Sequence, residues 1–167
     1  MTSASWFDDK RYLQSYTAAA PYEAEEKTKR LALHDYYCFA DYPSGQLRMT
    51  IKDLAAYALA WLREGSSSVV TNQMREEAWK KKYSGVTSFG VGWTVYEMQE
   101  NPEDFVFSSV DGFGHDGGEK GVNSWLFLAP KHDLAFGFVC NTSDDSEGSV
   151  ANHVMSVLAE SLGVHRQ

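Results

Sequence analysis

The stretch GFGHDGGEKGVNSWLFLAPKHDLAFGFVCNT, residues 112–142, decides the fold of this chain of 167 residues. It begins with glycines spaced around one histidine and continues as two apolar runs, Val122–Leu128 and Leu134–Cys140. The short connection Ala129–Asp133 predicts that the two runs form an antiparallel hairpin of core strands. We interpret the glycine-rich segment as a loop whose backbone can approach a ligand closely. Backbone amides at a strand edge, beside a polar side chain, are typical of a site that binds an oxyanion or a carboxylate.

An amphipathic helix is predicted over residues 50–64 from the spacing of its apolar residues. Thr50 is suited to cap the first turn, and Gly65 is suited to end the helix. The apolar stripe follows three- and four-residue steps and consists of Ile51, Leu54, Ala55, Ala58, Leu59 and Leu62. Such a stripe is typical of a helix that packs on a core.

Four further elements are predicted along the chain. A second helix is expected from about Thr71 to Lys82, and strands are expected at Phe89–Met98 and Phe105–Val110. Valines and leucines at helical spacing predict a closing helix over Ser146–Val164. No internal repeat, low-complexity segment or interdomain linker interrupts this series. The sequence therefore predicts one domain, with helices in residues 50–82 and sheet strands and the closing helix in residues 89–164.

Length and composition agree with a single globular domain. A chain of 167 residues is long enough to bury a core, and a hydrophobic content of 43% excludes general disorder. Residues 1–48 form the irregular part, because two tyrosine-rich clusters, Tyr12–Tyr22 and Tyr36–Tyr42, flank a charged run without clear periodicity. Such a segment must lean on other parts of the protein to stay ordered.

Charge and apolar patterns of the sequence bear on the partners and the compartment of the protein. The net charge of −8, with no offsetting basic stretch, argues against nucleic-acid binding. No apolar run approaches the roughly 18 residues of a transmembrane segment. No signal peptide opens the chain, since Thr2–Lys10 is polar. The compartment stays undetermined, because a cytoplasmic protein and a periplasmic or extracellular parent with a missing N-terminus both fit.

The histidines do not predict a metal or cofactor site. His34 and His132 are each followed by an aspartate, and His153 stands alone. Neither a pair at i, i+4 nor a convergent spacing supports metal ligation. We therefore expect no metal and no cofactor.

Four segments of the chain resemble the serine β-lactamase-related family, which includes class C β-lactamases, penicillin-binding D-Ala-D-Ala peptidases and related esterases. The segments occur in family order and cover nearly the whole chain. They are Met1–Trp6, Tyr42–Leu54, Phe89–Trp93 and Gly114–Gly121. The third is similar to the family's Tyr-Gly-Leu-Gly-Trp strand, and the fourth contains a His-x-Gly triplet. The ordered set is more specific than any one of its members.

The resemblance implies a fold and a candidate site. The fold would be an α/β (α+β) three-layer sandwich with an antiparallel sheet of the β-lactamase/transpeptidase type, incomplete in this chain. In the family, His-x-Gly takes the place of Lys-Thr-Gly on an edge strand that lines the site. By resemblance, His115, Asp116 and Gly117 bind substrate, and the backbone N–H of Gly118 is one oxyanion donor. Asp116 departs from the family's small or hydroxyl residue, and its charge would repel a substrate carboxylate.

The resemblance implies an activity for which two family motifs are absent. The family hydrolyses an amide, β-lactam or ester of a small molecule or peptide through an acyl-enzyme. Its nucleophile lies in Ser-x-x-Lys, but no lysine of this chain has a serine three residues before it. The second motif of the family is Tyr-x-Asn or Tyr-x-Ser. Its one formal match here is Tyr42–Ser44, which we interpret as a coincidence because it falls inside another family segment.

Both missing motifs belong upstream of Met1 in the family. We therefore expect a truncated hydrolase that has no catalytic residue of its own and is inactive alone. The alternative is a non-catalytic binding or interaction domain that keeps the cleft without the nucleophile.

The resemblance also implies an exposed sheet edge. In the family the C-terminal strand pairs with an N-terminal strand, which this chain lacks. The strand Leu134–Cys140 would then present an apolar, unpaired edge, and such edges recruit other chains. We therefore expect self-association through residues 134–140.

Overall fold

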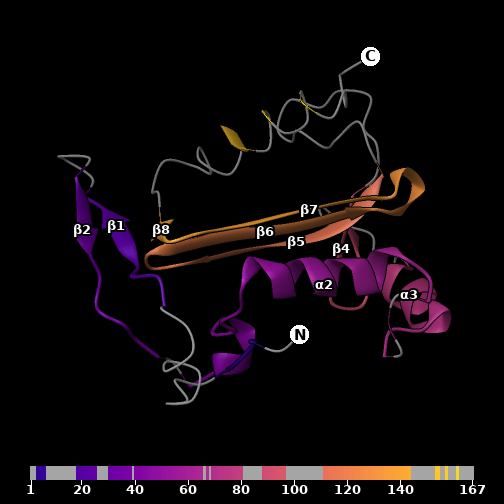
Figure 1. The fold of residues 1–167 in the computed structure, drawn as a ribbon, viewed down its shortest axis with the longest axis horizontal. Coiled ribbons are helices and arrows are strands. Elements are labelled where there is room, and N and C mark those ends of the chain that lie inside the picture. Colours follow the sequence, from indigo (N-terminus) through magenta and orange to yellow (C-terminus); the bar gives the residue numbers. More distant parts are fainter. Residues whose placement is uncertain are drawn as a thin grey trace.

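The computed structural model describes residues 3–6, 18–25, 30–38, 40–65, 67, 69–80, 88–96 and 111–143, together with residues 153, 154, 157 and 161. In this part of the chain, two helices and two sheets form a mixed α+β fold (Figure 1). The pairings in both sheets are antiparallel except for one parallel pair.

The larger sheet has five strands in the order β3-β4-β5-β6-β7. Their bounds are Ser88–Phe89 for β3, Thr94–Tyr96 for β4, Gly112–Glu119 for β5, Val122–Ala129 for β6 and Leu134–Cys140 for β7. The hairpin of β6 and β7 confirms the prediction from the two apolar runs. Its connection contains a short 3-10 turn, Pro130–His132, followed by Asp133 in a left-handed conformation with φ of 49°. Aspartate tolerates this conformation better than most residues.

The glycine-rich stretch before β6 is a strand and not the predicted loop. Residues 112–119 form β5, whose eight residues pair with β6 from Phe113↔Leu128 to Glu119↔Val122. Glycine has a low intrinsic preference for strands, so the pairing with β6 sets this conformation. The tight connection at the tip depends on Gly121, whose φ is +74°.

The predicted strand Phe89–Met98 is also wrong as a single element. It is a hairpin of β3 and β4, in which Gly90 N–H donates to the Trp93 carbonyl at 2.8 Å and Gly92 has a φ of +71°. The predicted strand at Phe105–Val110 lies outside the described residues.

The two predicted helices are confirmed, with shorter bounds. They are α2, Ile51–Leu62, and α3, Asn72–Trp79. The hydroxyl of Thr50 accepts the Asp53 N–H at the start of α2, and the hydroxyl of Thr71 accepts the Met74 N–H at the start of α3. Both are side-chain N-caps of the kind that the sequence indicated.

Arg75 of α3 joins the two helices. The side chain is only 6% exposed. Its Nη1 donates to the carbonyl oxygens of Ala60 at 3.0 Å and Arg63 at 2.8 Å, and its Nη2 donates to Asn72 of its own helix. The last carbonyls of a helix have no partner within the helix, so a buried guanidinium satisfies them and complements the helix dipole.

One face of the larger sheet packs on α2 and α3. The shared cluster contains Leu128 from β6, Ala58 from α2, Ala78 from α3 and Trp93 from the β3–β4 hairpin. Gly137 of β7 brings the helix close, because a Cβ at this position would lie 3.3 Å from Leu54 Cδ2. Figure 1 shows α2 lying along the sheet under β6 and β7.

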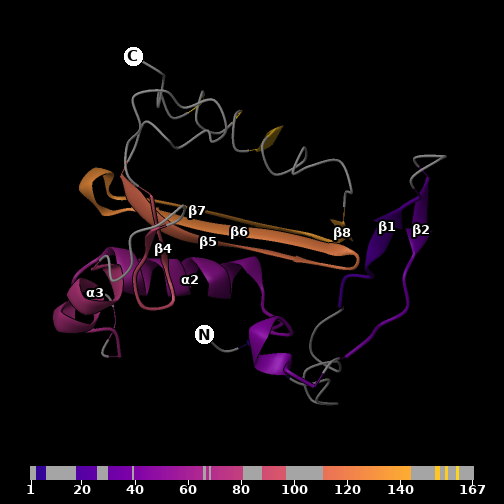
Figure 2. The ribbon, with the colours of Figure 1, turned by 180° about the vertical axis from the view of Figure 1, so that it is seen from behind.

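The opposite face of the sheet carries a second cluster, built from Phe127, Ala129 and Phe136. Successive residues of a strand point to opposite faces, so Phe127 and Leu128 serve different clusters. Val154, one of the helical residues described near the C-terminus, packs on this face. Figure 2 shows the few described residues near the C-terminus, coloured yellow, on the far side of the sheet from α2. Helices on one face and helical residues on the other give the order of layers in an α/β sandwich. Most of the predicted closing helix, Ser146–Val164, lies outside the described residues.

A smaller sheet, which the sequence did not indicate, stands at the tip of the β5–β6 hairpin (Figures 1 and 2). Its order is β2-β1-β8, with bounds Leu31–Leu33, Tyr22–Ala24 and Thr142–Ser143. The Tyr37 hydroxyl donates to the Lys120 carbonyl at 2.9 Å, and the Gly121 N–H donates to Ser143 Oγ at 2.9 Å. These bonds hold the tip of the β5–β6 hairpin against Tyr37 and against β8.

Candidate functional site

The four residues of the candidate site lie in the second half of β5. Strand β4 pairs with β5 only from Gly112 to Gly114. From His115 to Glu119, β5 therefore has β6 on one side and, among the described residues, no strand on the other. Backbone amides of an antiparallel strand point alternately to its two sides, so part of this backbone faces the open edge. The strand is internal to the sheet at its start and an edge where the candidate residues lie.

His115 is exposed and lies outside both core clusters. It shares its sheet face with Phe113, on the side of α2 and α3. Its Nδ1 lies 2.6 Å from the carbonyl oxygen of Asp116. This geometry suits the tautomer in which Nδ1–H donates to that carbonyl, which leaves Nε2 as an acceptor for a ligand.

The two glycines after Asp116 differ in their surroundings. A Cβ at Gly117 would lie 2.7 Å from Ser124 Oγ, whereas a Cβ at Gly118 would meet no atom within 4 Å. Gly118 is also exposed. The space beside the Gly118 backbone can therefore hold a group of a bound ligand.

Asp116 lies on the opposite face of β5 from His115, together with two aromatic residues. Its partner across the strands is Trp125, and Tyr96 lies near both. Burial, and second the charge of Asp116, raise the pKa of Tyr96 to about 12. The Tyr96 phenol therefore stays neutral at ordinary pH and is not a candidate base.

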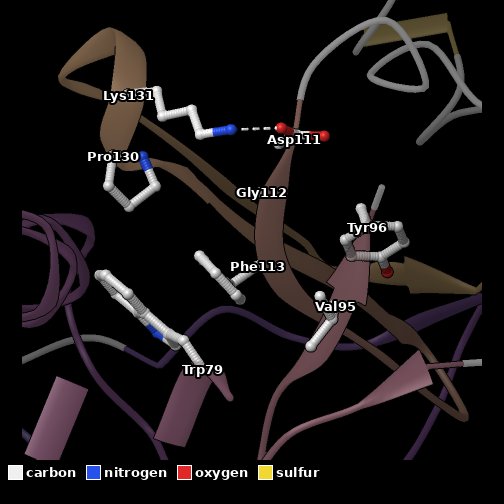
Figure 3. Close-up of a pocket in the computed structure, with 8 residues that line it drawn as sticks. All are labelled: Trp79, Val95, Tyr96, Asp111, Gly112, Phe113, Pro130 and Lys131. Atoms are coloured by element: carbon white, nitrogen blue, oxygen red, sulfur yellow. Dashed lines mark hydrogen bonds and ion pairs between the residues drawn. The ribbon is translucent and has the colours of Figure 1, made fainter. Parts of the chain in front are cut away.

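A pocket of about 440 Å3 opens near the start of β5, away from the four candidate residues (Figure 3). Trp79 and Phe113 stack along one side with ring centroids 4.5 Å apart and an interplanar angle of 9°. Lys131 and Asp111 form an ion pair of 2.6 Å across the pocket. The other lining residues are Val95, Tyr96, Gly112 and Pro130.

Sequence reasoning missed this pocket. Its walls come from α3, β4, β5 and the turn after β6, which are brought together only by the fold. The only part of the sequence that pointed to this pocket is the glycine-spaced run Gly112–Gly114, which alone does not indicate a wall of a pocket.

The described residues contain no group of three or more His, Cys, Asp or Glu side chains arranged to hold a metal ion. Within the same residues, neither helix is long and apolar enough to cross a membrane.

Helices on one face of a largely antiparallel sheet, and helical residues on the other, have the arrangement of an α/β sandwich. A model of the Beta-lactamase family matches residues 3–160. The chain therefore belongs to the β-lactamase family, which confirms the family inferred from the four sequence segments. No curated protein matches the chain.

Proposed function

We propose that this chain provides the substrate-binding strand of a serine hydrolase that acts on an amide, β-lactam or ester through an acyl-enzyme. The observation that carries the proposal is the open edge of β5 from His115 to Glu119, in a chain of the β-lactamase family. A strand edge of this kind can pair with an extended substrate through backbone hydrogen bonds.

Each candidate residue has a role in this proposal. The Gly118 N–H donates to the carbonyl oxygen of the substrate, where negative charge develops during acyl transfer. His115 Nε2 accepts a hydrogen bond from the substrate, and the short contact from Nδ1 to the Asp116 carbonyl holds the ring in place. Gly117 keeps the backbone close to β6, because a side chain there would collide with Ser124 Oγ.

The substrate is expected to lack a carboxylate next to the reacting carbonyl. The Asp116 side chain is exposed beside the edge, and among the described residues it forms no ion pair. An anion so close would repel a second anion. A neutral ester or amide therefore fits this edge better than a penicillin does.

The chemical step needs a nucleophile that the sequence does not show. Ser-x-x-Lys is absent from residues 1–167, so we expect that this chain alone forms no acyl-enzyme. Incubation with a fluorescent penicillin or a fluorophosphonate, followed by intact-mass measurement, tests this. A stoichiometric serine adduct that prior denaturation abolishes would show that an unrecognised serine is activated.

Binding is tested separately from chemistry. Phenyl acetate, a neutral ester, is titrated into 15N-labelled protein, and the amide signals of residues 115–119 are followed by NMR. We expect saturable shifts at Gly118 that His115→Ala weakens, with His132→Ala as the control because His132 lies in the turn after β6. Penicillin G at equal concentration should shift these signals less. Shifts that spread evenly over the sheet, or that are the same in both variants, would contradict the proposal.

A second proposal concerns assembly. Strand β7 is the last strand of the larger sheet in the described part of the chain, and its Val139 is 58% exposed. We infer that the edge of residues 134–140 pairs with the same edge of a second copy. An antiparallel pairing about a two-fold axis would join the sheets of two copies into one continuous sheet. Both copies would then use the same strand edge, including the backbone around Val139, in the interface.

A further inference from the structure

The face of β5 opposite His115 carries one carboxylate, and two aromatic rings lie on the same face. Asp116 and Trp125 are directly paired across β5 and β6, so their side chains lie next to each other on one face. The side chain of Asp116 is exposed. Neighbours on one face of an antiparallel pair have Cβ atoms roughly 5 Å apart, which is contact distance for a ligand that touches both.

Tyr96 completes this group from the other side. Its ring lies over Gly114, since a Cβ at Gly114 would be 3.1 Å from Tyr96 Cε2. Gly114 and Asp116 are two residues apart in a strand and therefore share a face. The rings of Tyr96 and Trp125 have centroids 6.3 Å apart and an interplanar angle of 34°. Asp116 therefore shares its sheet face with two neighbouring aromatic rings, Trp125 directly across on β6 and Tyr96 from β4.

Among the described residues, Asp116 forms no ion pair. Lys131 is paired with Asp111 at 2.6 Å, and Arg63 is paired with Asp133 at 2.7 Å. Both pairs lie at the other end of the hairpin from the tip of β5 and β6. An exposed carboxylate that has no ion-pair partner in the described part of the chain and shares a sheet face with two aromatic rings has the chemistry of a cation receptor.

We propose that Asp116, Tyr96 and Trp125 form a binding site for an organic cation of the alkylammonium class. The carboxylate supplies the charge, and the two rings supply the electron-rich faces that attract a poorly hydrated cation within about 6 Å of a ring centroid. A small inorganic cation would keep its water shell and gain little from the rings. An anion would be repelled. The site needs no nucleophile, so its binding of a cation can be measured separately from the proposed hydrolysis.

The probe for this site is tetramethylammonium chloride, titrated into the 15N-labelled chain at constant ionic strength. We expect saturable NMR shifts at the Trp125 indole N–H and the Asp116 amide, with half-saturation at roughly tens of millimolar, because three weak exposed contacts act together. Sodium chloride in its place should give only small, linear shifts. Sodium acetate should give no saturable shift.

Variants separate this site from general charge effects. Asp116→Asn should weaken binding about fivefold, and Asp116→Glu should keep most of it, because the charge is retained. Trp125→Leu should abolish saturation. Asp35→Asn is the matched control, since it removes an exposed carboxylate at the far side of the smaller sheet and should leave binding unchanged. Equal affinity in the wild-type chain and Asp116→Asn, or shifts that remain linear in the wild-type chain, would overturn the proposal whether or not the chain binds an ester.

Discussion

Replacing Arg75 with methionine is expected to destabilise the protein more than any other change of an arginine in the described residues. The substitution keeps an unbranched side chain of similar length and removes the guanidinium. The carbonyls of Ala60 and Arg63 then lose donors that lie 3.0 Å and 2.8 Å away. Because Arg75 is 6% exposed, water cannot easily take the place of these donors.

The magnitude follows from those two hydrogen bonds. A hydrogen bond from a charged donor contributes about 1.5–3 kcal/mol to stability, and the two share one nitrogen, so they do not add fully. Release of the buried charge offsets part of the loss. We expect a decrease of about 2–4 kcal/mol in the free energy of unfolding. For a domain of this size, that corresponds to a melting temperature lower by roughly 5–15 °C.

The assay is urea unfolding followed by far-UV circular dichroism, repeated for Arg63→Met as the control. Like Arg75, Arg63 donates two hydrogen bonds from its guanidinium. They go to the carboxylate of Asp133, at 2.8 Å and 2.7 Å, but both of these side chains are largely exposed. Solvent screens such a pair, so the control should change stability far less. Equal effects of the two substitutions, or a loss below about 1 kcal/mol for Arg75→Met, would refute the idea that this buried guanidinium holds the two helices together.

Three further outcomes are expected. Gly114→Ala should cost about 1–3 kcal/mol, because a Cβ there would lie 2.7 Å from a carbonyl oxygen of β6, whereas Gly118→Ala on the same strand face should be close to neutral in a melting experiment. The raised pKa of Tyr96, about 12 against 10.0, means that the unfolded chain loses the phenol proton first, so stability should fall as the pH rises from about 10 to about 12, and Tyr96→Phe should flatten this part of the profile. Light scattering should show concentration-dependent self-association that Val139→Lys removes and Val69→Lys, at another exposed valine, does not; an unaltered dimer in Val139→Lys would exclude β7 as the interface.

The elements that the sequence predicted well are those whose signal is local. The stripe and caps of α2, and the two apolar runs of β6 and β7, are contained within a few consecutive residues. Even there, burial was only partly predictable. Ile51 and Leu59 belong to the predicted stripe of α2 but are 59% and 41% exposed, whereas Ala58 is buried. The helix turns a narrower face to the sheet than its apolar spacing suggests.

The elements that were missed depend on partners distant in the sequence. Strands β1 and β2 have three residues each, and β1 pairs in parallel with β8. Segments so short carry no period that a sequence window can detect. The sequence did not predict β5 as a strand for a related reason. Its glycines have a low strand propensity, and the strand is stabilised by its pairing with β6. The family motif located the candidate residues, but only the fold placed His115 and Asp116 on opposite faces.

The smaller sheet has a consequence for the order in which the protein assembles. Strands β5, β6 and β7 follow one another directly, so their contacts are short-range and should form early. The smaller sheet must instead join segments as far apart as Ala20 and Asn141, whose hydrogen bond spans 121 positions. Closing so long a loop carries a large entropic cost, which places this step late in folding. Because Gly121 is then held by Ser143 of β8, the far end of the strand that carries His115 should reach its final position only after the segments around Ala20 and Asn141 have met.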